Sequence, residues 1–229
     1  MQTVDIPSKF IEGIFVQELK NRFLCEVLID GVPTVCYVPS SCHLGNFLDL
    51  RNKKVLLVRT QTPKSRTQYA LFAIPYKKSQ IILNTSMANS AVANSVHGRR
   101  FSYLGPRKTI FKEHRIDEYK ADLYIKDTNT IIEIKSIIST NKTGVFPTVY
   151  SERTLNQLKK IQYLLSHGYK VCFIIVSLNP YVSEIEIDKQ SEFFKHFKTC
   201  INQGMIVKGY ACSLVENCLK ISKGIEIKL

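Results

Sequence analysis

Short runs of alternating apolar and polar residues fill the first part of the chain. A period of two is typical of strands that bury one face. Asp30-Gly31 is a tight-turn signal between two of these runs. Short strands at even spacing predict a small closed or partly closed β-barrel, which we assign to residues 1–83. The predicted strands cover residues 14–19, 23–29, 32–38, 54–60 and 68–74.

Residues 84–110 differ in character from the runs before them. Asn84-Thr85 can cap a helix from Ser86 to Val96 that ends at Gly98. The stretch 85–110 contains four basic residues and no acidic one: Arg99, Arg100, Arg107 and Lys108. We interpret 84–110 as a helix followed by a basic connector.

Residues 111–229 alternate strand-like and helix-like patterns. Strands are predicted at 121–126, 130–138, 170–178 and 205–213. Helices are predicted at 152–167 and from a cap at Asp188 through Ile201. This mixture predicts a second domain that is built as a mixed sheet flanked by helices.

A charged segment stands out in this second domain. Asp122 and Glu133 are separated by ten residues, and Lys135 follows at the second position after Glu133. The turn cluster 127–129 lies between two β-rich runs and predicts a hairpin. Side chains alternate along a strand, so Glu133 and Lys135 share one face, which Asp122 can reach from the neighbouring strand.

Two interpretations of this segment remain open. Its charges interrupt a strand rich in isoleucine, where a charge needs a partner or a metal. Mg²⁺ prefers one or two carboxylates together with phosphate and water, and a nearby lysine can orient a metal-bound water. The alternative is a solvated pair of surface charges, which contributes little.

The charge of the chain favours a polyanionic partner. The 229 residues have a formal net charge of +13 and are 45% hydrophobic, enough for a sizeable core. General solubility charge is the alternative explanation. A basic and aromatic face of the barrel is a candidate nucleic-acid surface, although its rings can equally fill the barrel core. The candidates are Arg22, Phe23, Tyr37, Arg59, Arg66 and Tyr69.

The cysteines and the apolar runs favour a cytoplasmic protein. The seven cysteines show no Cys-x-x-Cys spacing and are expected to be free thiols of a reducing compartment. No apolar run approaches the ~18 residues that a membrane span requires. The first residues lack the pattern of a secretory signal, and we expect no membrane partner.

Several separate motifs resemble the sugar fermentation stimulation (SfsA) family across nearly the whole chain. Early matches are Asn21–Val27 followed by Asp30-Gly31, Val38–Ser40 with Leu44-Gly45, and Asn84–Asn89. Later matches are Asp122 with Glu133–Lys135, Gly144–Pro147 through Ser151–Arg153, Ile187-Asp188 and Gly204–Tyr210. Several motifs in the right order are more specific than any one of them.

The resemblance implies an N-terminal OB-like barrel and a C-terminal nuclease-type domain of the PD-(D/E)XK class. It also implies DNA binding, with a proposed part in regulating sugar catabolism in bacteria. Three stretches depart from the family pattern. Tyr119-Lys120 replaces Ser-Arg, Thr148 replaces Asp, and Asn156-Gln157 replaces Lys-His.

We therefore expect one divalent ion, Mg²⁺ or Mn²⁺, at Asp122, Glu133 and the backbone carbonyl of Ile134. Glu113 is a further candidate ligand, and its alternative is a solvated helix charge. Lys135 would position the attacking water, and with Asp122 and Glu133 it forms the expected catalytic set. The expected nucleic-acid contacts are Arg22, Arg99, Arg100, Lys120 and Arg153.

Three functions compete at this point. The first is a metal-dependent nuclease that acts on double- or single-stranded DNA. The second is a DNA-binding regulator of sugar catabolism genes that keeps a nuclease scaffold without cleaving. The third is a protein-interaction module whose basic charge is incidental.

Overall fold

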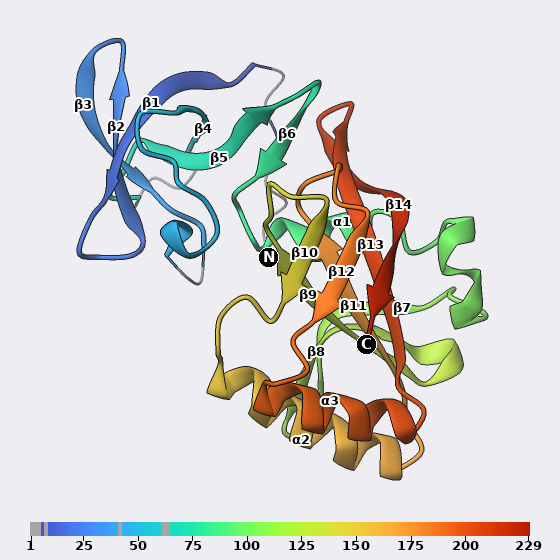
Figure 1. Ribbon diagram of the computed structural model, residues 1–229. Coiled ribbons are helices and arrows are strands. Elements are labelled where there is room, and N and C mark those ends of the chain that lie inside the picture. Colours follow the sequence, from blue (N-terminus) through green and yellow to red (C-terminus); the bar gives the residue numbers. More distant parts are fainter. Residues whose placement is uncertain (1–5, 7–8, 41–42, 61–64) are drawn as a thin grey trace.

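The structure, a computed structural model, describes residues 6, 9–40, 43–60 and 65–229. Figure 1 shows a small β-barrel beside a larger sheet that carries helices. The two parts correspond to the predicted barrel and the predicted mixed domain, so the expected fold class is confirmed.

The barrel is closed by a pairing between strands that are distant in the sequence. Its strands are β1 (Ile11–Glu18), β2 (Leu24–Ile29), β3 (Val32–Tyr37), β4 (Lys54–Arg59), β5 (Tyr69–Tyr76) and β6 (Ser79–Ile82). They follow the order β3-β2-β1-β4-β5-β6, and Tyr37 of β3 pairs with Ala70 of β5 to close the ring. The four-residue β6 extends the sheet beyond the ring and was not predicted.

The second sheet has eight strands in the order β10-β12-β14-β13-β11-β9-β8-β7. The strands are β7 (Ile110–Ile116), β8 (Tyr119–Ile125), β9 (Thr130–Ile137), β10 (Thr143–Phe146), β11 (Lys170–Ser177), β12 (Glu184–Ile187), β13 (Ile206–Val215) and β14 (Cys218–Lys228). The β9–β11 and β11–β13 pairs are parallel, whereas β7, β8 and β9 pair antiparallel. The sheet is therefore mixed, as predicted.

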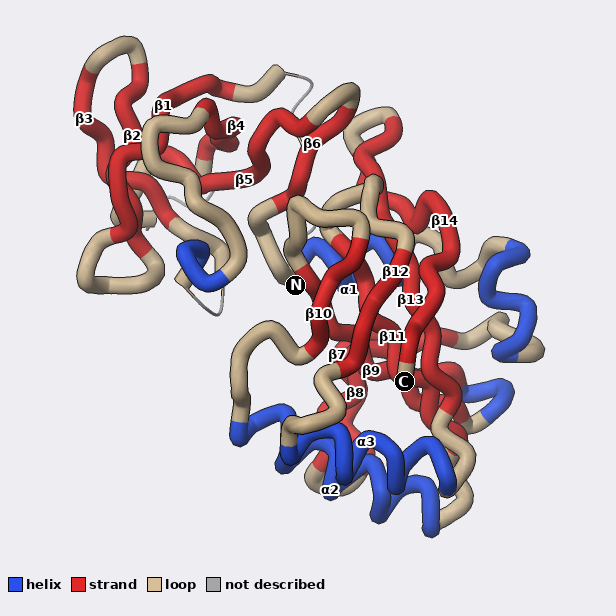
Figure 2. Tube along the Cα trace, in the orientation of Figure 1, coloured by secondary structure: helices blue, strands red, loops and turns tan. Residues whose placement is uncertain are grey.

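Helices cover both faces of this sheet. They are α1 (Met87–Ala93), α2 (Glu152–Ser166) and α3 (Glu192–Asn202), with 3-10 turns η1 (Leu44–Asn46), η2 (Arg99–Leu104) and η3 (Lys126–Thr128). Figure 2 shows α2 and α3 side by side along the same part of the sheet. They enclose one core, whereas α1 and η2 belong to a second core on the other face.

The sequence of α2 explains its position. Leu155, Leu158, Ile161 and Leu164 recur at helical spacing and are buried. The Ser151 side chain accepts a hydrogen bond from the N–H of Thr154 and caps the first turn. The helix therefore places its first turns, which carry polar residues, beside β8.

Two predicted helix boundaries are wrong. The helix expected from Asp188 begins at Glu192, because Asp188 accepts from the nearby N–H of Gln190 while Ser191 caps the helix. The helix expected through Val96 ends at Ala93. The polar side chains of the next two residues, Asn94 and Ser95, bond to the backbone of β14 instead.

The prediction also missed β7, β10, β12 and β14. β10 and β12 have only four residues each, too few to show a period. β7 carries consecutive charged and polar residues from Lys112 to Arg115 because it is the last strand of the sheet. Solvent on an edge strand removes the alternation that reveals a strand in a sequence.

The barrel and the second sheet share backbone contacts and a core. The N–H of Ile82 in β6 donates to the carbonyl of Leu178 just after β11, at 3.0 Å. The Tyr76 hydroxyl donates to the Thr140 carbonyl at 2.7 Å. One continuous cluster of buried side chains runs from the barrel through α1 to the sheet.

Two further expectations bear on the described residues. No helix in this part of the chain is long and apolar enough to cross a membrane. The described cysteines are free thiols: Cys25, Cys36, Cys172, Cys200, Cys212 and Cys218. Burial raises the pKa of the Cys36 thiol to about 11, so this thiol stays protonated at neutral pH. Cys42 lies outside the described residues.

We expect Gly13→Ala to destabilise the barrel. A Cβ at Gly13 in β1 would overlap the Val27 side chain and lie 2.9 Å from the carbonyl oxygen of Leu28. Overpacking of this kind costs roughly 1–3 kcal/mol, measurable by urea denaturation. Gly224→Ala in β14 is the matched control, because nothing lies within 4 Å of the added Cβ. Equal stability of the two variants would contradict the close approach.

Candidate functional site

Strands β7 and β8 change face at one shared position. Before Asp122, Tyr119 and Ala121 point into the core under α2, whereas Leu123 after it points into the opposite core. The β7–β8 ladder skips the pair of Glu113 with Asp122, and Glu113 has a φ of +51°. Asp122 therefore sits at a local break in the sheet.

The carboxylate of Asp122 replaces a strand partner. The β8–β9 register ends at Leu123 and Ile132. Beyond it, the N–H of Ile134 donates to Oδ2 of Asp122 at 2.7 Å, and Nδ2 of Asn89 in α1 donates to Oδ1 at 2.8 Å. The break thus holds the carboxylate with one backbone donor and one side-chain donor.

Burial raises the pKa of Asp122 from 3.8 to about 6, and the negative charge of Glu133 contributes to the rise. The Ile134 N–H, the Lys135 ammonium and the Asn89 amide act in the opposite direction. Carboxylates that repel each other in a partly buried site are a feature of functional sites.

Glu133 is buried on the α2 side of β9. Its side chain is 2% exposed, and its Oε1 lies 2.7 Å from the Nζ of Lys135. The Tyr119 hydroxyl donates to its other oxygen. Burial and the charge of Glu133 raise the pKa of Tyr119 well above 10, so Tyr119 remains a protonated donor.

Lys135 connects the sheet to α2. Its Nζ donates to Oε1 of Gln157 at 2.6 Å as well as pairing with Glu133. The predicted sharing of one face by Glu133 and Lys135 is confirmed. The expected triad thus lies at one place, with Asp122 entering through the break and Glu133 from the α2 side.

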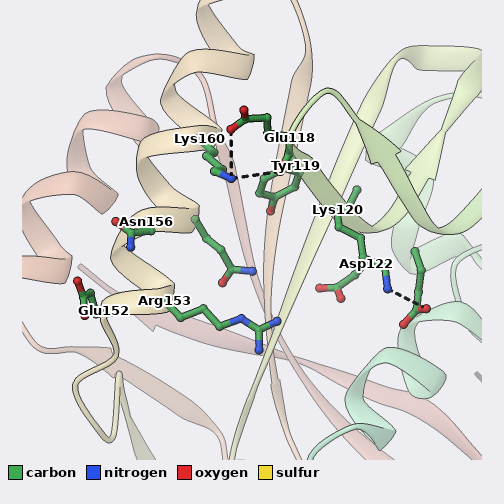
Figure 3. Close-up of a pocket in the computed structure, with 11 residues that line it drawn as sticks. Glu118, Tyr119, Lys120, Asp122, Glu152, Arg153, Asn156 and Lys160 are labelled. Atoms are coloured by element: carbon green, nitrogen blue, oxygen red, sulfur yellow. Dashed lines mark hydrogen bonds and ion pairs between the residues drawn. The ribbon is translucent and has the colours of Figure 1, made fainter.

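A cavity of about 600 Å³ opens beside this site. Figure 3 shows Arg153 extending from α2 toward the strand that carries Lys120 and Asp122. Lys120 pairs with Glu113 at 3.1 Å, and Lys160 pairs with Glu118 at 3.8 Å. The lining residues are Glu113, Glu118, Tyr119, Lys120, Ala121, Asp122, Glu152, Arg153, Asn156, Gln157 and Lys160.

The structure brings some of the expected residues together and separates others. Lys120, Arg153 and Glu113 line the cavity with Asp122, and Glu113 lies in β7, so its interpretation as a helix charge is wrong. Arg22 lies before β2 in the barrel, with its guanidinium 4.8 Å from the centre of the Phe23 ring. Arg99 and Arg100 belong to η2.

Arg100 and Ile134 make contacts within the protein that differ from the DNA contact and the metal ligand expected of them. The guanidinium of Arg100 donates to the Ser222 carbonyl at 2.7 Å. Ile134 reaches Asp122 through its N–H, while its carbonyl, the expected ligand, remains a prediction. Among the described residues, no three His, Cys, Asp or Glu side chains form a group that could hold a metal ion. A cation here would rest on two carboxylates.

Sequence reasoning missed the three residues that hold the charged groups in place. They are Asn89, Tyr119 and Gln157, which contact Asp122, Glu133 and Lys135 respectively. Each belongs to a motif or a departure that the resemblance singled out. Of these three, only Asn89 had a local signal in the sequence: it is a polar residue within the small, mostly apolar helix α1.

Two family models match the chain. The model described as "SfsA N-terminal OB domain" matches residues 19–83. The model described as "Sugar fermentation stimulation protein RE domain" matches residues 86–218.

Similar proteins have the length of this chain. A "Sugar fermentation stimulation protein homolog" of Ruminiclostridium cellulolyticum is 26% identical over 95% of this chain and 96% of its own. One of Caldanaerobacter subterraneus is 24% identical over 98% of this chain and 99% of its own. The solved "structure of Pyrococcus Furiosus SfsA in complex with Ca2+" has a TM-score of 0.80 and 14% identity, and covers 97% of both chains. It shares the fold.

We expect Asp122 to make stability depend on pH in metal-free buffer. Its folded pKa of about 6 exceeds its ordinary 3.8, so its stabilising contribution is complete below 3.8 and falls as the pH rises through 6. Asp122→Asn cannot ionise. Between pH 5 and 7.5 the free energy of unfolding of the native protein should fall by on the order of 1 kcal/mol relative to this variant, as measured by urea denaturation. A pH-independent difference would contradict the raised pKa.

Proposed function

The chain belongs to the SfsA family, and from this premise we propose that it binds DNA and cleaves phosphodiester bonds with a divalent metal ion. The observation that carries the proposal is the pair of carboxylates, Glu133 buried and Asp122 half-buried, beside a cavity whose lining includes Lys120 and Arg153. Asp122 and Glu133 repel each other, and Lys135 contacts one of them directly. Arg153 and Lys120 stand at the cavity where a phosphate would enter.

The donor set fits a hard cation. Asp122, Glu133 and the carbonyl of Ile134 would hold Mg²⁺ or Mn²⁺, since such ions take one or two carboxylates and complete their shell with water and phosphate. The similar Pyrococcus furiosus protein was solved in complex with Ca²⁺, another cation that prefers oxygen ligands. When bound, the ion supplies Lewis acidity and lowers the pKa of a coordinated water. Glu113 is a further acid at the cavity, although Lys120 neutralises it at 3.1 Å.

Lys135 is positioned to orient the nucleophile. An ammonium group has three donors, and Glu133 and Gln157 accept two of them. The third can donate to a water or to a phosphate oxygen on which charge develops. Gln157 therefore holds the amine on the α2 side, while Tyr119 fixes the carboxylate that the amine contacts.

Two basic residues of the cavity suit the phosphate backbone. Arg153 extends from α2 and can contact two phosphate oxygens with its guanidinium. Lys120 offers a point charge from the opposite wall. Arg22, Arg99 and Arg100 lie outside this cavity lining, so their DNA contacts would extend the bound length rather than serve the reacting phosphate.

A DNA-binding regulator that does not cleave is the second candidate. One observation favours it: both oxygens of Asp122 and both oxygens of Glu133 already accept hydrogen bonds or an ion pair from the protein. A metal would share these oxygens with the present donors. Either function is compatible with the cytoplasmic location that the free thiols favour.

We expect Lys135→Ala to lower cleavage at least about 100-fold, because it removes a group that acts on the transition state. Cleavage of supercoiled plasmid and of a single-stranded oligonucleotide would be measured with Mg²⁺, with Mn²⁺ and with EDTA. Lys159→Ala, an exposed lysine of the same helix as Gln157, is the control and should cleave normally. Cleavage that survives EDTA or Lys135→Ala would refute the mechanism. Binding without cleavage in any metal would favour the regulator.

Binding should weaken steeply with salt if phosphate contacts dominate. Arg153→Ala and Lys120→Ala should each reduce the slope of log affinity against log salt by about 1, because each removes one phosphate contact. Lys195→Ala, an exposed lysine of α3, should leave the slope unchanged. Fluorescence anisotropy of labelled DNA across a salt series measures the slope. A flat response of the native protein would favour the interaction module.

A further inference from the structure

Three aromatic rings stack against one another on β7 and β8. The ring of His114 lies 5.1 Å from that of Phe111 and 4.9 Å from that of Tyr124, between ring centres. The planes of His114 and Tyr124 differ by 8°, and those of Phe111 and Tyr124 by 19°. Phe111 is 39% exposed, so the cluster continues to the surface.

The same sheet break that holds Asp122 creates this cluster. Residues 111 and 114 are three apart, so a regular strand would point Phe111 and His114 to opposite faces. Glu113 lies between them in the left-handed region, with a φ of +51°, and turns His114 to the face of Phe111. A non-glycine residue in this region is strained, and such strain is a pointer to function.

The ring cluster adjoins the cavity. His114 is the cross-strand partner of Ala121, which lines the cavity, and Phe111 is the partner of Tyr124. Glu113 lines the cavity directly. β7 is the last strand of the sheet, so the rings lie at the edge of the sheet.

Packing within the protein explains only part of the cluster. Tyr124 packs against the core under α2, and its hydroxyl donates to Oδ1 of Asn129 at 2.8 Å. Phe111 instead keeps much of its surface in solvent. Two exposed cations, Lys112 and Arg115, follow Phe111 and His114 in the chain, although Lys112 pairs with Leu123 and so lies on the other face of the sheet from the rings. A stack of rings that ends at a partly exposed ring suits the stacking of single-stranded bases.

We propose that Phe111, His114 and Tyr124 form a stacking platform for the unpaired bases of single-stranded DNA. The inference deepens the proposed function, on which it rests, by naming the substrate class. A base stacked on Phe111 would continue the existing stack of rings. Because Glu113 and Ala121 beside the rings line the cavity, a neighbouring phosphate would be within reach of Lys120 and Arg153 there.

The test is equilibrium binding of an oligonucleotide that contains 2-aminopurine, whose fluorescence is quenched when it stacks. Binding is measured in EDTA, for the single strand and for the same strand annealed to its complement. Phe111→Ala should weaken single-strand binding about fivefold or more and relieve the quenching, while duplex binding stays unchanged. Phe111→Tyr should restore both signals because it keeps a ring.

A partly exposed ring elsewhere provides the control. Phe194→Ala on α3 should leave single-strand binding unchanged, and thermal melting verifies that each variant is folded. Unchanged single-strand binding by both Phe111→Ala and His114→Ala would overturn the platform, and so would an equal loss for single strand and duplex. Binding is measured in EDTA, so it does not depend on metal-dependent cleavage. If the protein stacks the base normally but shows no nuclease activity in the cleavage assay, the proposed nuclease function is refuted and the stacking platform is not.

Discussion

The hydrogen bond from the N–H of Ile134 to the carboxylate of Asp122 is the interaction on which the site depends. It satisfies a backbone donor at the point where β8 and β9 separate. An unpaired donor at this depth would cost about 1–3 kcal/mol, so the carboxylate makes the separation tolerable. The separation in turn admits Asp122 to a position between the two cores. The separation of β8 from β9 and the position of the Asp122 carboxylate therefore depend on each other.

Burial of two carboxylates is a cost that the surrounding residues offset in different ways. Asn89 reaches Asp122 from α1, on one face of the sheet, whereas Tyr119 and Lys135 contact Glu133 on the other. Neutral donors stabilise the charged forms without adding charge, and the ammonium group compensates one charge fully. Burial, and after it the repulsion from Glu133, raise the pKa of Asp122. The proposed divalent ion would relieve this repulsion.

The sequence predicted the parts of the site that depend on local periodicity. Glu133 and Lys135 were placed on one face because strands alternate, and the hairpin to Asp122 followed from its turn residues. Asn89 and Gln157 were not predicted as partners, because tertiary packing brings them from helices distant in the chain. The left-handed Glu113 was also invisible, since nothing in its identity distinguishes it from an ordinary strand residue. The edge strand β7 was also not predicted, because its exposed charged residues do not alternate with apolar ones.

One core continues from the barrel into the sheet, so the barrel and the second domain are not independent folding units. Met87, Ala91 and Phe101 are buried in the cluster that also holds barrel residues such as Phe72. Division of the chain near residue 84 would strip apolar cover from both pieces at once. Unfolding should consequently be a single cooperative event across both segments. A protein that contained only one of the two segments would need another surface to cover the apolar side chains that the missing segment buries here.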